Sequence, residues 1–333
     1  MNTTQFKHSI LTLALLGIMG GSVLAQSNSK VEVKELNQSQ TGLLNKQELD
    51  IGNSTGGGKA KVTTGNVSQT QVGLLNSQTL TVGSAKNGGK SDVTVAGSVG
   101  QIQAGMLQKQ DMNIGSVNGS GSSNVKVGTV GQTQAGMLQK QNMNIGGVEG
   151  SGKSNVKVGA AGQAQAGMLN RQNMEIGNVS GSGKSNVIVG AAGQLQAGML
   201  NNQNMEIGKS TGGGKSNVVV GAAGQAQAGM LNNQEVKIGN ASNGATSRVL
   251  VGTTIQGQAG MLNNQQINIG NASKGSSNVA VGAVVQAQAG MLNNAQVNIG
   301  NAHGGSTAVA VGAVVQGQAG MLQSNKINIG NTQ

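Results

Sequence analysis

A seven-residue motif, Gln-x-Gln-x-Gly-(Met/Leu)-Leu, recurs ten times between residues 38 and 322 and constrains the fold more than any other feature. Consecutive copies lie 31 residues apart, except for one step of 32 and two steps of 30. Such regularity predicts a stacked array of identical units and argues against a domain with one specialised site. The ten central glycines are Gly42, Gly73, Gly105, Gly136, Gly167, Gly198, Gly229, Gly260, Gly290 and Gly320.

The first 25 residues differ from the repeats and are typical of a secretory signal peptide. Lys7 precedes an apolar run from Ile10 to Leu16, and small residues follow before Val23-Leu24-Ala25. We expect cleavage after Ala25, which leaves residues 26–333 as a single repeat domain outside the cytoplasm. The apolar run is too short and too rich in glycine to predict a membrane span.

The repeat domain has a restricted composition. Phe6 is the only aromatic residue of the chain, and there is no proline or cysteine. Disulfides and thiolate metal sites are therefore excluded, and the aromatic platforms on which proteins usually stack nucleic-acid bases are absent from residues 26–333. The net charge of +11 falls to +10 once Lys7 is removed, and only 9% of the residues are charged. We regard this charge as secondary to the repeat.

Each unit alternates apolar and variable positions in the manner of a β-strand. In the copy at residues 215–240, Val218 and Val220 flank a position that is Lys, Ile, Leu or Ala elsewhere. Fixed valines around a variable neighbour indicate one buried and one exposed face. We predict a strand from this pair to Leu231, a turn at Asn232-Asn233, and a second strand ending at Ile238-Gly239. The Gly/Ser-rich segment 210–214 predicts a loop, and nothing predicts a helix.

One unit cannot fold alone, because ordering 31 backbone units costs on the order of 30 to 60 kcal/mol. Stacking pairs each strand with its equivalents above and below and places identical side chains in register. Glutamine suits such columns because its amide both donates and accepts hydrogen bonds. Two amide ladders follow. One runs from Gln38 to Gln316, and the other consists of Gln40, Gln71, Gln103, Gln134, Gln165, Gln196, Gln227, Gln258, Gln288 and Gln318.

The expected fold is an all-β solenoid of about ten stacked coils of 31 residues with cross-β stacking. Two or three strands per coil both remain open. The expected core residues are Leu107, Leu138, Leu169, Leu200 and Leu231 together with Ile145, Ile176, Ile207 and Ile238. The first Val-x-Val pair lies soon after the predicted cleavage site, and no capping unit is recognisable at either end. Uncapped edges predict pairing with further copies.

The repeats resemble two families of bacterial functional amyloid. Gln227-x-Gly229 with the later Gln234, and Gln134-x-Gly136 with Gln141, are similar to the curli major subunit repeat. The segment from Ser216 to Gln227 is similar to repeats of the Fap fibre subunits.

The resemblance extends over residues 31–330 and has departures, among them Ala295 and Asn325 at the closing glutamine position. It implies secretion to the surface of a Gram-negative bacterium through an outer-membrane pore, a nucleating partner, and homopolymer fibres in a biofilm matrix.

The alternative hypothesis is a monomeric solenoid adhesin. Lys153, Lys184 and Lys215 fall in one column on the Gly-rich loop, with Lys59 and Lys90 in looser equivalents. Such a column is a candidate contact for acidic polysaccharide or extracellular DNA, and it equally serves to keep the chain soluble.

Enzymatic chemistry finds little support in the sequence, and we expect neither enzyme activity nor a cofactor. Residues 147–154 match Gly-x4-Gly-Lys-Ser, but a strand follows where a phosphate loop needs a helix. The methionines could in principle bind Cu(I), yet Leu43 and Val236 replace them in other copies, which favours core filling. His303 has no recurring acid or nucleophile beside it.

Overall fold

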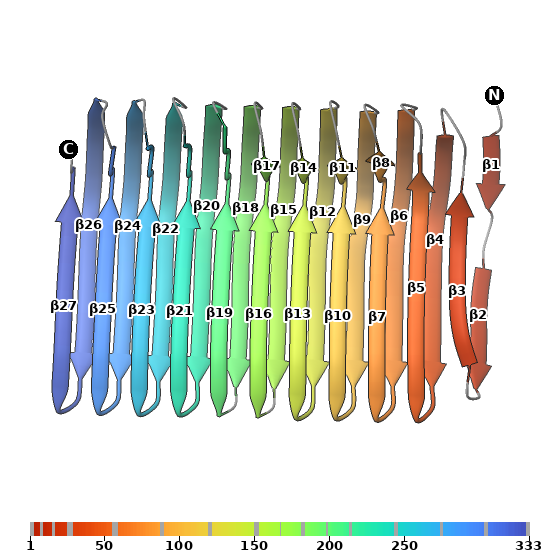
Figure 1. Cartoon of the computed structure of the whole chain (residues 1–333), viewed down its shortest axis with the longest axis horizontal. Coiled ribbons are helices and arrows are strands. Elements are labelled where there is room, and N and C mark those ends of the chain that lie inside the picture. The colour runs from red at the N-terminus through yellow and green to blue at the C-terminus, as the bar shows by residue number, and fades with distance from the viewer. Residues whose placement is uncertain are drawn as a thin grey trace.

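The structure is a computed structural model of the chain (Figure 1). It describes residues 3–6, 9–14, 17–24, 29–54, 59–86, 90–118, 122–149, 153–166, 168–180, 184–197, 199–212, 215–242, 246–273, 276–302 and 306–330. These residues form parallel strands stacked along one axis, and no helix occurs among them. A helix long and apolar enough to cross a membrane is accordingly absent from this described part. The predicted β-solenoid is confirmed.

Each coil begins with a long strand that buries every second side chain. In β20 (Lys215–Ala228), Ser216, Val218 and Val220 are buried, whereas Lys215 and Asn217 are exposed. The equivalents of β20 are β4 (Ser29–Thr41), β6 (Lys59–Val72), β9 (Lys90–Ala104), β12 (Ser122–Ala135), β15 (Lys153–Ala166), β18 (Lys184–Ala197), β22 (Ser247–Ala259), β24 (Ser277–Ala289) and β26 (Thr307–Ala319).

A shorter strand completes each coil and runs back along the opposite face. In β21 (Leu231–Ile238), the buried side chains are Asn232, Gln234, Val236 and Ile238. Its equivalents are β5 (Leu44–Asn53), β7 (Leu75–Val82), β10 (Leu107–Ile114), β13 (Leu138–Ile145), β16 (Leu169–Ile176), β19 (Leu200–Ile207), β23 (Leu262–Ile269), β25 (Leu292–Ile299) and β27 (Leu322–Ile329).

The long and short strands form two separate parallel sheets that face each other (Figure 1). Strands follow chain order in both sheets, and pairing joins equivalent repeat positions, as in Val218 with Val187 and Ile238 with Ile207. A third, narrow sheet of β8 (Ala85–Lys86), β11 (Val117–Asn118), β14 (Val148–Glu149) and β17 (Val179–Ser180) lies after the short strands of four coils. Identical side chains therefore lie in columns along the axis.

The corner after each short strand requires glycine. Gly208 and Gly239 have φ of +79° and +78°, and the equivalent glycines from Gly52 to Gly330 share this left-handed conformation. A Cβ on Gly239 would collide with Cγ2 of Val249 in the next coil. The buried Ser154 hydroxyl stabilises the equivalent corner by donating to the carbonyl oxygen of Gly146 at 2.6 Å. From Gly52 to Gly300, a side chain at this corner meets both backbone strain and a steric clash.

The interior contains an aliphatic zone and an amide zone. Val218, Val220 and Ile238 are buried near the glycine corner. Gln227 and Gln234 are buried near the turn that joins the two strands. The chain thus fills a large part of its core with amides, which is tolerable only because they bond to one another.

The N-terminal segments continue the stack. Strands β1 (Thr3–Phe6) and β2 (Ser9–Ala14) pair in parallel with β4, and β3 (Gly17–Leu24) pairs with β5. The segment that the sequence marks as a signal peptide therefore lies against the first coil of the full chain. The predicted cleavage site at Ala25 falls outside the described residues.

The turn between the two strands lies three residues earlier than predicted. The long strand β20 ends at Ala228, Gly229 and Met230 form the turn, and Asn232 and Asn233 belong to β21. The prediction of a turn at Asn232-Asn233 is wrong because the Asn232 amide is used inside the coil. Its Nδ2 donates to the carbonyl oxygen of Ala259, 3.0 Å away in the next coil.

Candidate functional site

The ladder that begins at Gln40 runs through the whole stack. Each Nε2 donates to Oε1 of the equivalent glutamine in the preceding coil, from Gln71 to Gln40 through Gln318 to Gln288, over 2.8 to 3.2 Å. These glutamines are buried up to Gln288. The chain of equally directed amides satisfies buried polar groups along the axis and gives the stack a direction.

The same amides also connect the two sheets. The Nε2 of Gln227 donates to the backbone oxygen of Asn233 at 3.4 Å, and the Nε2 of Gln134 reaches that of Lys140 at 3.3 Å. An amide nitrogen carries two hydrogens, so one serves the preceding coil and the other serves the opposite strand.

The second predicted ladder is equally continuous. Bonds of 2.7 to 3.0 Å join Gln69 to Gln38 and every later pair through Gln316 and Gln286. Both ladders belong to the long strands and face the short ones.

A third ladder, which the sequence analysis does not predict, lies on the short strands. It joins Gln47, Gln78, Gln110, Gln141, Gln172, Gln203, Gln234 and Gln265 by bonds of 2.8 to 3.0 Å. Ala295 follows in the column and cannot donate, so Oε1 of Gln265 is buried without a partner. The regular recurrence of this glutamine in the repeats was the available signal.

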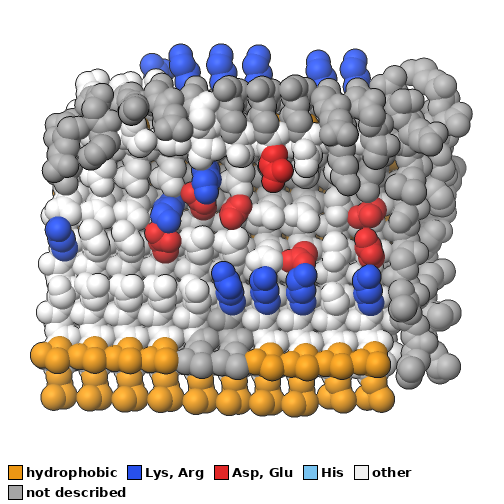
Figure 2. Space-filling view, in the orientation of Figure 1, with side chains coloured by type: hydrophobic (Ala, Val, Ile, Leu, Met, Phe, Trp, Pro, Cys, Tyr) orange, Lys and Arg blue, Asp and Glu red, His pale blue; other side chains and the backbone are white. Residues whose placement is uncertain are grey.

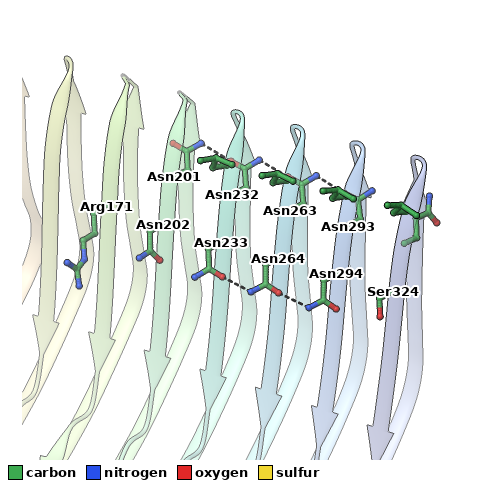
Figure 3. A pocket seen from close by; sticks show the side chains of 15 residues that line it. Arg171, Asn201, Asn202, Asn232, Asn233, Asn263, Asn264, Asn293, Asn294 and Ser324 are labelled. Atoms are coloured by element: carbon green, nitrogen blue, oxygen red, sulfur yellow. Dashed lines mark hydrogen bonds between the residues drawn. The ribbon is translucent and has the colours of Figure 1, made fainter.

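An asparagine column next to the turn runs in the opposite sense. Nδ2 of Asn232 donates to Oδ1 of Asn263 at 2.9 Å, and Asn263 donates to Asn293 at 2.8 Å (Figure 3). On the outer face, Asn264 donates to Asn233, and Asn294 donates to Asn264, at 3.1 Å (Figure 3). Amide columns therefore lie on both faces of the short-strand sheet.

The predicted core residues divide into two groups. Ile145, Ile176, Ile207 and Ile238 are buried within the main aliphatic core. The leucine prediction is wrong for Leu107, Leu138 and Leu231, which are 41 to 42% exposed. The side chains of Leu169 and Leu200 lie outside the described residues. Leucine is the first residue of each short strand, where the alternation that buries Gln234, Val236 and Ile238 turns Leu231 outward.

The methionines divide in the same way. Met112, Met143, Met174 and Met205 fill the core as predicted. The prediction is wrong for the methionine before each leucine, because Met106, Met137 and Met230 are 43 to 47% exposed at the turn.

The C-terminal coil presents an open edge. On their outer side, β26 and β27 adjoin no other strand of the described chain. Ile327 and Ile329 are consequently 46 and 48% exposed, although their equivalents Val297 and Ile299 are fully buried. Oε1 of Gln318, the last acceptor of the first ladder, has no hydrogen-bond partner. The edge therefore exposes apolar area and leaves a buried ladder acceptor without a hydrogen-bond partner.

The first coil carries the side chains that would continue these columns. Val31, Val33 and Leu36 occupy the repeat positions of Val309, Val311 and Val314, and Gln40 occupies that of Gln318. The column that starts at Glu48 ends at Lys326. Four of the ten acidic residues lie in the first coil, namely Glu32, Glu35, Glu48 and Asp50, and none follows Glu235. The two ends therefore match in register and carry opposite charge where Glu48 and Lys326 would meet.

The lysine column forms as predicted along the loop edge. Lys153 pairs with Lys184 and Lys184 with Lys215 in the long-strand sheet, and all three are exposed. Lys59 and Lys90 occupy the same column, and Ser122 separates them from Lys153. The row of cations is visible at the top of the molecule (Figure 2).

Other sequence candidates lie partly outside the described residues. His303 and residues 150–152 of the phosphate-loop pattern are not described, and Lys153-Ser154 open β15. Within the described part of the chain, no three His, Cys, Asp or Glu side chains cluster in a way that could hold a metal ion.

Comparison with known proteins gave no match to any protein family, curated protein or solved structure.

Proposed function

We propose that this chain is a secreted structural subunit that polymerises end to end into extracellular amyloid-like fibres of a biofilm matrix. In this proposal the last coil of one copy pairs with the first coil of the next, and the columns continue across the joint. The chain catalyses no reaction. The predicted export pore and nucleator belong to the same proposal.

The open edge of β26 and β27 is the observation that carries this proposal. Parallel in-register stacking offers the same pairing surface at every step, so an unpaired last coil provides a template for an eleventh. Adding that coil would bury Ile327 and Ile329 and supply a donor for Oε1 of Gln318. Removal of the predicted signal peptide makes the opposite edge, β4 and β5, available.

The charges of the two ends favour joining head to tail. Glu48 and Lys326 lie in one column but nine coil steps apart, which is about 43 Å at ~4.8 Å per step. Within one molecule their interaction is negligible, because the separation exceeds the Debye length at physiological ionic strength. In a fibre they become neighbours across the joint. An energetic coupling between Glu48 and Lys326 would therefore show that the last coil of one copy lies against the first coil of the next.

The first test is a charge-swap cycle on the mature chain, residues 26–333. Seeded elongation rates are measured for Glu48→Lys, Lys326→Glu and the double variant. Each single variant places like charges at the joint, so we expect elongation to slow several-fold. The double variant restores an opposite pair and should recover most of the rate. Independent effects of the two substitutions would contradict a head-to-tail joint.

X-ray diffraction provides the control for fibre structure. Fibres should give a meridional reflection near ~4.7 Å. If the purified mature chain stays monomeric for days with seeds present, the fibre proposal is wrong. That result would favour the alternative, a monomeric adhesin whose lysine column binds acidic polysaccharide. Binding to a sulfated polysaccharide that is lost in Lys153→Ser/Lys184→Ser/Lys215→Ser would then support that alternative.

A further inference from the structure

A continuous apolar ridge follows the turn edge of the stack. We define the turn ridge as residues 43–44, 74–75, 106–107, 137–138, 168, 199, 230–231, 261–262, 291–292 and 321–322. All are Met or Leu and are between 40 and 79% exposed. Figure 2 shows them as the row of hydrophobic side chains along one edge of the molecule. The ridge has the period of the coils.

The exposed area of this ridge is too large for an ordinary monomer surface. At roughly 80 Å² of exposed apolar area per side chain, the ridge presents on the order of 1,500 Å². Apolar patches on soluble monomers rarely exceed about 600 Å². A standard interface buries only about 800 Å² on each partner. The ridge alone therefore suffices for a stable interface.

The borders of the ridge differ in polarity. On the long-strand side it is flanked by exposed alanines, such as Ala135, Ala228 and Ala259. On the short-strand side, the residue two positions after each leucine is outward and polar. That column reads Lys46, Ser77, Lys109, Lys140, Arg171, Asn202, Asn233, Asn264, Asn294 and Ser324. All four cations thus lie in the first five coils.

We propose that the turn ridge docks against the turn ridge of a second, antiparallel copy of this chain. A surface with the same period is its natural complement, because each Met and Leu then meets equivalent side chains at every step. This inference deepens the proposed function, since a fibre carries the ridge along its whole length and pairing doubles the filament.

Charge and polarity select the antiparallel orientation. A two-fold axis perpendicular to the sheets sets alanine border against alanine border and polar border against polar border. It places the first coil opposite the last, so Lys109 faces Asn264, Lys140 faces Asn233, and no cation faces a cation. The amide oxygens offer acceptors to the cations. A parallel pair would instead set each polar border against alanines.

A shallow groove beside the leucines supports such a contact. It has a volume of about 850 Å³ and runs between the leucine row and the outer asparagine row of coils six to ten (Figure 3). Leu231, Leu262 and Asn233 belong to its lining. The ridge of a partner can enter a depression of this kind without displacing the coils.

The test compares two triple variants of the mature chain, altered in the same three coils. Met199→Gln/Met230→Gln/Met261→Gln changes the ridge. Ile188→Thr/Val219→Thr/Leu250→Thr removes exposed aliphatics from the outer face of the long-strand sheet and is the matched control. Mass per unit length of fibres is measured by scanning transmission electron microscopy. We expect the ridge variant to fall to half the wild-type value, with elongation within about two-fold, and the control to keep it.

Two results would overturn the pairing: wild-type fibres with the mass per unit length of a single filament, one chain per ten coil steps, or a ridge variant whose mass per unit length is unchanged. Neither result would contradict end-to-end growth. If no fibres form, the proposed function is wrong. The ridge pairing is then tested separately, by measuring the oligomeric state of the soluble chain in sedimentation experiments. A wild-type dimer that the ridge variant converts to monomer supports it, and a wild-type monomer overturns it.

Orientation is tested by cross-linking, for which the absence of cysteine is convenient. Chains with Lys109→Cys are mixed with chains carrying Asn264→Cys, which lie five coils apart and are not brought together by end-to-end growth. Under oxidation we expect mixed disulfide-linked dimers in at least several-fold excess over dimers of either variant alone. An excess of like-with-like dimers would refute the antiparallel arrangement.

Discussion

At the scale of single residues, the corner glycines set the path of each coil. Gly239 has a φ of +78° and donates its N–H to the backbone oxygen of Ile207 at 2.8 Å. A Cβ here would strain the backbone and collide with Val249. Gly224 lies in the long strand of the same coil, where an added Cβ meets nothing within 4 Å.

We therefore expect Gly239→Ala to lower the free energy of unfolding by about 1 to 3 kcal/mol. Gly224→Ala should be neutral or stabilise by up to about 1 kcal/mol, because it restricts the unfolded chain. Urea denaturation of soluble chain measures both. Equal losses in the two variants would mean that corner geometry is not the cause.

At the scale of the strand, stability depends on unbroken amide ladders. Gln227 in β20 both donates to Gln196 at 3.0 Å and accepts from Gln258 at 3.1 Å. Its neighbour Ala226 faces outward, and the equivalent position in β18 already carries Leu195, which is 58% exposed. The two adjacent positions therefore offer a matched pair for the same substitution.

Gln227→Leu leaves one buried acceptor and one buried donor without their ladder partners. Each such group costs about 1 to 3 kcal/mol, and the leucine recovers part of this, so we expect a net loss of about 2 to 4 kcal/mol. Ala226→Leu should change stability by less than about 0.5 kcal/mol. Chemical denaturation distinguishes them, and a Gln227→Leu chain as stable as the Ala226→Leu chain would show that the ladders contribute little.

At the scale of the whole molecule, charge is distributed unevenly along the stack. The lysine column repeats one cation per coil from Lys153 through Lys215, while the last three coils have few charges. Like charges about 5 Å apart repel one another, and the repulsion is weakened by salt.

Raising NaCl from about 0.01 M to about 1 M shortens the Debye length from about 30 Å to about 3 Å, so the urea midpoint of the chain should rise. The triple variant Lys153→Ser/Lys184→Ser/Lys215→Ser removes these charges; serine is chosen because Ser122 already occupies the same column. This variant should have a higher urea midpoint at low salt and a weaker dependence of the midpoint on salt. If the triple variant keeps the wild-type salt slope, the column is not the source of the repulsion.

Much of the fold follows from the repeat alone. The 31-residue period predicts the parallel register, and it therefore predicts the two ladders through Gln38 and Gln40. Alternation around Val218 and Val220 correctly separates buried from exposed positions. The third ladder through Gln47 could have been found in the same way, because the position recurs with the same period.

The candidate site was harder to predict than the fold. The identity of Leu231 with its counterparts predicts burial, but a side chain repeated in every coil gains equivalent neighbours on either face of a sheet. Local residue preferences placed the turn at Asn232-Asn233, whereas the tertiary structure uses the Asn232 amide within the stack. Local residue preferences give no indication of a hydrogen bond between residues in neighbouring coils.

The sequence by itself determined a parallel in-register stack, because only identical neighbours satisfy columns of buried amides and aliphatics. The tertiary structure alone decided where the chain folds over. Had the first strand continued past Ala228, its alternation would have carried Leu231 inward. With the turn at Gly229-Met230, Leu231 instead follows the alternation of Gln234 and Ile238 and faces outward. Side-chain direction has a period of two, so a shift of one residue at the turn exchanges core for surface.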